Sequence, residues 1–167
     1  LQASLFPALR ARHFLPIYVR LGLRPDAPGI PDQLRQCVCD AVKEGASGAT
    51  LPADSEGVWE YLHRTDVELW DSRNYLLTPI LVIDQFEELF TVGQQVPTLV
   101  RDFRHDFGDL VENRIPPSVM SRLEHDENTS TAFALRSRSY KLLISLREDF
   151  LPDLEDWQQL IPMLGRS

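Results

Sequence analysis

The chain has 167 residues, of which 43% are hydrophobic and 25% are charged. This length and composition suffice for one globular domain with a hydrophobic core, and hardly for two. The formal net charge of −8 argues against a general nucleic-acid-binding surface, which needs clustered basic side chains. No apolar run reaches the ~18 residues that would suggest a membrane span. We therefore expect one domain that binds neither nucleic acid nor membrane.

The two cysteines, Cys37 and Cys39, lie two residues apart on a predicted helix. They therefore point to different faces of that helix, which argues against a disulfide bond between them. A zinc site is also disfavoured, because the sequence has no second cysteine pair and no nearby histidine cluster. Reduced thiols are typical of cytoplasmic proteins, so we expect a cytoplasmic location.

The beginning of the chain predicts a short helix followed by a strand. Leucines recur at helical spacing over Leu1–Ala11, although Pro7 weakens the pattern near its end. Phe14–Leu21 contains β-branched and aromatic residues and is followed by a segment rich in proline and glycine, Gly22–Pro31. We interpret Phe14–Leu21 as a strand and Gly22–Pro31 as a turn.

Two helices are predicted before the middle of the chain. The first begins at Pro31, a residue that favours helix starts, and it ends in a loop over residues 45–52 that contains two glycines and a proline. Its core-facing stripe consists of Leu34, Cys37, Val38, Ala41 and Val42. The second helix is capped by Asp54 or Ser55. Its apolar residues are Val58, Tyr61, Leu62 and Leu69.

Two apolar runs in the second half of the chain predict strands buried on both faces, as in parallel sheets covered by helices. These runs are Thr78–Asp84 and Tyr140–Leu146. An amphipathic helix is predicted over Leu99–Val111, a loop over the charged segment Glu124–Ser130, and a last helix over Leu154–Leu164. Strands that alternate with helices indicate a doubly wound α/β layer.

Charged residues follow both of these apolar strands. Asp84 closes the first, Glu87 and Glu88 come three and four residues later, and Arg147 follows the second. Because ligands of open α/β sheets bind at the carboxyl ends of the strands, we expect these side chains at one edge. A strand-end aspartate holds Mg²⁺ through its waters, and a second carboxylate orients or deprotonates the attacking water. An arginine at a neighbouring strand end binds the γ-phosphate, so the pattern indicates ATP hydrolysis.

The same residues also have structural explanations. An apolar strand that ends in aspartate is common in α/β proteins, and Glu87 and Glu88 also suit the acidic first turn of a helix. A strand-end arginine such as Arg147 also suits a surface ion pair. An unrelated hydrolase is a weaker alternative, because the sequence has no G-x-S-x-G nucleophile elbow and its histidines are scattered. We expect each histidine at the surface or as a satisfied core residue: His13, His63, His105 and His125.

Val82–Phe90 closely resembles the Walker B segment of bacterial STAND-type NTPases, the class that contains the relatives of plant and animal innate-immune NTPases. Leu142–Phe150 resembles the sensor strand of the same class. Leu1–Leu9 looks like the helix that follows the P-loop in these proteins, and Leu15–Leu21 looks like their second strand. The resemblance runs in order along the chain and is weak over residues 93–138.

The resemblance assigns roles to the charged residues. It implies that Asp84 is the Mg²⁺-side aspartate and that Arg147 contacts the terminal phosphate of the nucleotide. Glu87 aligns with the carboxylate that serves the water, and Glu88 beside it is the second choice. The fold implied is a partial three-layer P-loop NTPase-like parallel sheet flanked by helices. Its strands lie near Leu15–Leu21, Thr78–Asp84 and Tyr140–Leu146.

The sequence contains no G-x-x-x-x-G-K-[ST] motif, although the P-loop backbone and its lysine supply most of the phosphate binding in such enzymes. The resemblance places the first strand and the P-loop upstream of Leu1 in a longer parent, so that residues 1–167 form one partial NTPase domain. We expect ATP and Mg²⁺ as cofactors of that parent. This chain alone is expected to bind ATP poorly and not to hydrolyse it.

The resemblance also predicts partners. In this class the sheet has the order second, third, fourth, first, fifth strand, so the strands near Ile17, Val82 and Ile144 are expected side by side. Without the first strand, one edge of the Ile144 strand is unpaired and invites self-association. The other partners implied are the remainder of the parent: the P-loop, a C-terminal lid and effector or repeat domains. The alternative function is a non-catalytic scaffold or interaction module built on an NTPase-like sheet.

Overall fold

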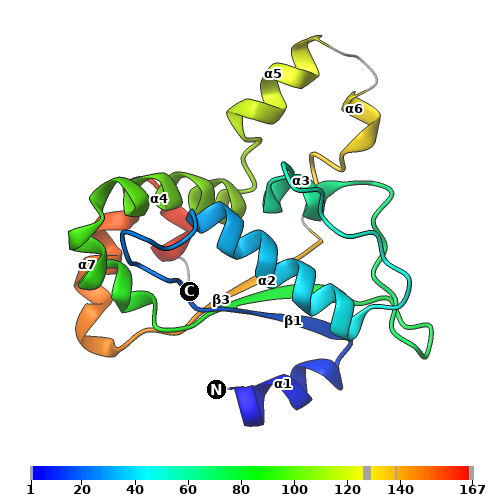
Figure 1. Ribbon diagram of the computed structural model, residues 1–167, viewed down its shortest axis with the longest axis horizontal. Coiled ribbons are helices and arrows are strands. Elements are labelled where there is room, and N and C mark those ends of the chain that lie inside the picture. The colour runs from blue at the N-terminus through cyan, green and yellow to red at the C-terminus, as the bar shows by residue number, and fades with distance from the viewer. Residues whose placement is uncertain (1, 126–128, 138, 166–167) are drawn as a thin grey trace.

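The computed structural model describes residues 2–125, 129–137 and 139–165 of the chain (Figure 1). In this part, three parallel strands form one sheet with the order β1-β2-β3. The strands are β1 (Phe14–Val19), β2 (Thr78–Ile83) and β3 (Lys141–Ile144). This confirms the predicted α/β class and the order of the three strands. Each strand ends earlier than predicted, at Val19, Ile83 and Ile144. The ladder pairs end at Ile83 of the central strand, so the residues after Val19 and Ile144 have no partner in it.

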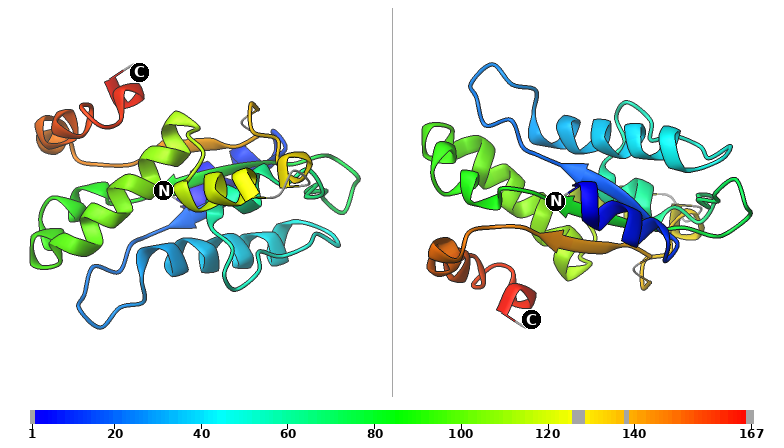
Figure 2. Two further views of the ribbon diagram at one scale, coloured as in Figure 1. Left: turned by 90° about the horizontal axis from the view of Figure 1, so that it is seen from above. Right: turned by 90° about the horizontal axis from the view of Figure 1, so that it is seen from below.

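Helices lie on both sides of the sheet. They are α1 (Gln2–Arg10), α2 (Ile30–Gly45), α3 (Val58–His63), α4 (Pro97–Glu112), α5 (Pro117–His125), α6 (Thr129–Ala132) and α7 (Leu151–Trp157). Helices α2 and α4 lie above the sheet in Figure 1 and α1 lies below it, while α5 and α6 project away from the sheet. The two views in Figure 2 show α1 crossing the lower face of the sheet. Short 3₁₀ turns cover 86–89, 92–95, 148–150 and 162–165.

The upper face of the sheet and helix α2 form the main hydrophobic core. The predicted stripe of α2 is confirmed, because Leu34, Val38 and Val42 are buried against the strands. Gly45, the last residue of α2, lies so close to the side chain of Leu15 that a Cβ at this position would collide with it. Glycine at this position thus lets the end of α2 lie close to the side chain of Leu15 on β1.

The second predicted helix is shorter than expected, and its predicted cap is wrong. Helix α3 ends at His63, so Leu69 lies outside it, although it is buried. The N-cap is Gly57 rather than Asp54 or Ser55. The chain leaves the helix at Arg64, whose backbone is extended and forms an isolated β-bridge with Phe133. This long-range pairing overrides the local helical spacing.

The last predicted helix is also wrong in its bounds. Helix α7 covers Leu151–Trp157, and a separate 3₁₀ turn covers Pro162–Gly165. Pro162 has no N–H to donate to the preceding turn and its ring would crowd the carbonyl of residue 158, which disfavours a helix through this position. The predicted loop Glu124–Ser130 is partly helical, because Glu124 and His125 end α5 and residues 129–130 begin α6. Residues 126–128 of that prediction, and Leu1 of the first predicted helix, lie outside the described residues.

The expectation that Cys37 and Cys39 form no disulfide bond is confirmed, because both are free thiols. Across residues 2–125, 129–137 and 139–165, no helix combines the length and the apolar character needed to cross a membrane.

Candidate functional site at the carboxyl ends of the strands

The acidic segment Asp84–Glu88 is held between the ends of the two neighbouring strands. Its backbone N–H groups donate to both sides, from Asp84 to the carbonyl of Val19 and from Phe86 to the carbonyl of Ser145, each at 2.9 Å. Gln85 between them has φ 56° and ψ 45°, a left-handed conformation that few residues other than glycine adopt. Such conformations gather at functional sites, because surrounding contacts must hold them in place. The turn directs the following carboxylates back to the edge of the sheet.

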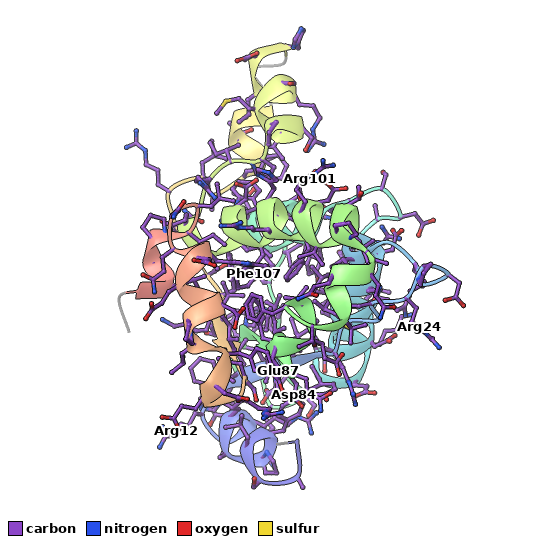
Figure 3. All side chains as sticks on the ribbon, turned by 90° about the vertical axis from the view of Figure 1, so that its left-hand side faces the viewer. Arg12, Arg24, Asp84, Glu87, Arg101 and Phe107 are labelled. Atoms are coloured by element: carbon purple, nitrogen blue, oxygen red, sulfur yellow. The ribbon has the colours of Figure 1, made fainter. Side chains whose placement is uncertain are left out.

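Apolar residues inside the segment anchor it to the core. Phe86 and Leu89 are buried, and both belong to the 3₁₀ turn Phe86–Leu89. The Phe86 ring lies 5.4 Å from those of Phe107 and Trp157, measured between centroids. Because these two residues at the ends of the turn face inward, the carboxylates between them remain near the edge. Figure 3 looks onto this edge and shows Asp84 and Glu87 next to each other, with Phe107 of α4 above them.

Both carboxylate oxygens of Asp84 accept hydrogen bonds from the protein. The hydroxyl of Tyr18, on β1, donates to Oδ2 at 3.0 Å. The backbone N–H of Gln85 donates to Oδ1 at 3.1 Å. A carboxylate has about four lone-pair positions, so two remain available for a ligand or for metal-bound water.

The two glutamates differ in their surroundings. Glu88 forms an ion pair with Arg20 at 3.1 Å, across from the end of β1. The Oε2 atom of Glu87 is buried and has no hydrogen-bond partner among the described residues. A buried carboxylate oxygen without a partner costs free energy in the isolated domain. Of the two glutamates, Glu88 has a cationic partner, and Glu87 Oε2 has no partner among the described residues.

Arg147 lies at the same edge but turns toward its own segment. It follows β3 by three residues, and Ser145 connects β3 to the acidic segment through hydrogen bonds to Ile83 and Phe86. The guanidinium pairs with Asp149 at 2.7 Å and lies over the Phe150 ring, 5.7 Å from its centroid. Its side chain is 68% exposed, so the ion pair is weak and open to exchange.

A magnesium site needs few ligands from the protein, and the residues at this edge fit that requirement. Mg²⁺ is usually held by one or two carboxylates, while waters and substrate phosphates complete its shell. Among the described residues, no group of three or more His, Cys, Asp or Glu side chains is arranged to hold a metal ion. Asp84, with lone pairs to spare, and the unpartnered Oε2 of Glu87 match the one-or-two-carboxylate pattern. They do not match a metal site made of protein groups alone.

Sequence reasoning missed the contribution of β1. Tyr18 and Arg20 both reach the acidic segment, whereas the pattern of Phe14–Leu21 predicted a strand and assigned neither residue to the site. The available signal was their position, since both stand near the carboxyl end of a predicted parallel strand, two residues apart and hence on the same side.

The two largest hollows have volumes of about 800 and 590 Å³, and neither lining includes a residue of the acidic segment. The second opens between α1, β1 and α2, and Tyr18 is part of its lining. A smaller hollow of about 370 Å³ opens at the amino ends of the strands, and its lining includes Leu69, Leu77 and Tyr140.

No protein-family model, no curated protein and no solved structure matches this chain.

Proposed function

We propose that this chain is part of the nucleotide-binding and ATP-hydrolysing core of a STAND-class signalling ATPase. The observation that carries the proposal is the meeting of Asp84 and Glu87 at the carboxyl end of β2, with a buried Glu87 oxygen that has no partner among the described residues. Arg147 at the end of the adjacent strand adds a cation to the same edge.

The direction of α1 supports the proposal. A connection of three residues, 11–13, joins α1 to β1, and the two elements pack against each other. Helix α1 therefore runs antiparallel to β1 and begins on the side where the strands end, as Figure 1 shows. The first turn of a helix presents free N–H groups and a partial positive charge, which bind phosphate. In the parent, a glycine-rich loop that precedes α1 would hold ATP against Asp84.

Each charged residue has a distinct proposed role. Asp84 would hold Mg²⁺ through its waters, and the ion, when bound, neutralises charge on the phosphate oxygens. Glu87 would orient or deprotonate the attacking water, while Glu88 serves the ion pair with Arg20. Arg147 would exchange its exposed contact with Asp149 for the terminal phosphate.

The outer edge of β3 is the proposed contact with the rest of the parent. Among the described residues, β3 pairs with β2 on one side, and its side chains are half-buried or exposed. We propose that the first strand of the parent pairs with the other side. Without it the edge is available to a second copy of the chain, so the isolated chain is expected to self-associate. Light scattering over a dilution series tests this, and a monomer at every concentration would contradict it.

The proposal is tested by comparing this chain with a longer parent that carries the P-loop. Calorimetry with ATP and Mg²⁺ should show binding by the parent and weak or no binding by residues 1–167. In the parent, Glu87→Gln should lower the hydrolysis rate by about 10²- to 10⁴-fold while ATP binding is retained. Glu88→Gln is the matched control and should have a much smaller effect. A tight ATP complex of the chain alone, or full hydrolysis by the Glu87 variant, would overturn the proposal.

A non-catalytic scaffold is the second candidate. The contact that favours it is the ion pair between Arg147 and Asp149, which is an ordinary surface pair as it stands. A parent that binds no ATP, or that binds it and never hydrolyses it, would support this second function.

A further inference from the structure

The side chain of Tyr18 connects the edge strand β1 to the aspartate of the acidic segment. Tyr18 is in register with Val82 of β2, so Asp84 lies two residues further along the neighbouring strand. Side chains two residues apart point to the same face of a sheet, and an aromatic side chain reaches this diagonal neighbour. The hydroxyl of Tyr18 spans the step and donates to Asp84 Oδ2 at 3.0 Å.

The Tyr18 ring is itself held in place. It lies between the sheet and α1, where its centroid is 6.2 Å from that of Phe6 in an edge-to-face arrangement at 65°. The residue is partly buried, and its backbone belongs to the hydrogen-bonded ladder with β2. Because the ring is fixed, its hydroxyl stays in one position. The Asp84 carboxylate must adopt the matching orientation to accept this hydrogen bond.

The hydroxyl provides one of two hydrogen bonds that hold the Asp84 carboxylate. Oδ2 accepts from Tyr18 and Oδ1 accepts from the N–H of Gln85, so the plane of the carboxylate is fixed from two directions. The partial burial of Tyr18 raises the pKa of its phenol, and the hydrogen bond to Asp84 and the charge of that carboxylate raise it further. The hydroxyl thus remains protonated and able to donate at neutral pH.

We propose that Tyr18 is a positioning residue that fixes the side-chain rotamer of Asp84 and so prepares it for a hydrated divalent cation. This inference rests on the proposed function for the identity of the ion. Metal-binding carboxylates are commonly held by a hydrogen-bond donor, and loss of such a donor lowers metal affinity by about 10- to 100-fold. Nothing in the sequence motif assigns this role to β1, because the residue lies more than sixty positions before Asp84.

The rotamer of Asp84 is the direct test and needs no metal. Three-bond couplings from the backbone to the Asp84 Cγ, measured by NMR on the labelled 167-residue chain, should report one rotamer. Tyr18→Phe keeps the ring and its packing on Phe6, and it should give couplings averaged over several rotamers. Tyr75→Phe is the matched control, since Tyr75 is half exposed and stacks on His13. Unchanged couplings in the Tyr18 variant would overturn the inference.

The metal itself is tested with Mn²⁺ alone, which broadens NMR signals near its binding site. The amide signals of Gln85 and Phe86 should broaden in the unmodified chain and in Tyr75→Phe, and not in Asp84→Asn. Tyr18→Phe should need about 10-fold more Mn²⁺ for the same broadening. Absence of localised broadening in the unmodified chain would contradict the metal role in the proposed function, while the couplings still decide whether Tyr18 positions Asp84.

Discussion

His63 and Glu87 are both polar side chains with buried hydrogen-bonding atoms, but they differ in what surrounds them. His63 is 1% exposed, and its ring nitrogens lie 2.7 Å from the carbonyl oxygen of Trp59 and 2.7 Å from Asn113 Oδ1. Its ring also stacks on Trp59 at 3.8 Å between centroids. Glu87 has a buried oxygen with no partner among the described residues.

We propose that the difference separates a structural polar group from one that is prepared for a ligand. Each ring nitrogen of His63 lies within hydrogen-bonding distance of an atom inside the domain, as predicted for a core histidine, and the ring joins α3 to the end of α4. Buried polar atoms without partners are uncommon in folded proteins, and each needs an explanation. For Glu87 that explanation is the proposed nucleotide site. Substitutions at and around the two residues test this contrast.

The largest effect is expected for Phe86→Ala, which removes the anchor beside Glu87. Phe86 is buried among the rings of Phe103, Phe107 and Trp157, so its loss opens a cavity. The free energy of unfolding should fall by about 3–5 kcal/mol, as measured by urea denaturation. Phe150→Ala is the control, since that ring is partly exposed, and it should cost clearly less. A loss below about 1 kcal/mol for the Phe86 variant would show that the segment does not depend on its anchor.

The second largest loss of stability is expected for His63→Ala. It removes the stacked ring and leaves the Trp59 carbonyl and the Asn113 amide without their partner, so the cost should be about 2–4 kcal/mol. His105→Ala, at an exposed position on α4, should change stability by no more than about 0.5 kcal/mol. Equal unfolding curves for the two histidine variants would contradict the structural role of His63.

Glu87→Gln should change stability far less. Because Glu87 Oε2 has no partner to lose, the free energy of unfolding of the isolated chain should stay within about 1 kcal/mol of the unmodified value. The variant should be as stable as the unmodified chain or slightly more stable, since it removes a partly desolvated charge. A loss above about 2 kcal/mol in thermal unfolding would indicate that Glu87 has a structural partner, and the contrast with His63 would fail.

The smallest effect is expected for Asp106→Asn on α4, whose thermal midpoint should depend on pH. Partial burial raises the pKa of Asp106 above its ordinary value, and the nearby carboxylates of Asp109 and Asp102 add to the shift. The folded chain then holds this proton more tightly than the unfolded chain, so its contribution to stability falls as pH rises from the ordinary aspartate pKa through the raised one. Asp106→Asn should therefore raise the thermal midpoint slightly at pH 7 and not at pH 3. A lower midpoint at pH 7 would contradict this sign.

Local pattern was sufficient for much of the fold. The apolar runs ending in Asp84 and near Leu146 predicted strands, because burial on both faces leaves a continuous hydrophobic signature. That burial is found for β2, but the prediction is wrong for β3, whose side chains are half-buried or exposed. The stripe of α2 was equally local, since helical periodicity alone decides which residues face the core. The bounds of α3 and α7 were not predictable in this way. The pairing of Arg64 with Phe133 cut the first of these helices short, and such a contact leaves no trace in local spacing.

The candidate site likewise has features that local sequence predicts and features that depend on tertiary contacts. By itself, the sequence determined that Asp84, Glu87, Glu88 and Arg147 stand just beyond strand ends, because strand length and chain order are local properties. Only the tertiary structure decided which carboxylate is held by Tyr18, which is paired with Arg20 and which is left without a partner. Those contacts depend on the register between β1 and β2 and on the left-handed turn at Gln85. Both arise from residues distant in the chain that come together only in the folded sheet.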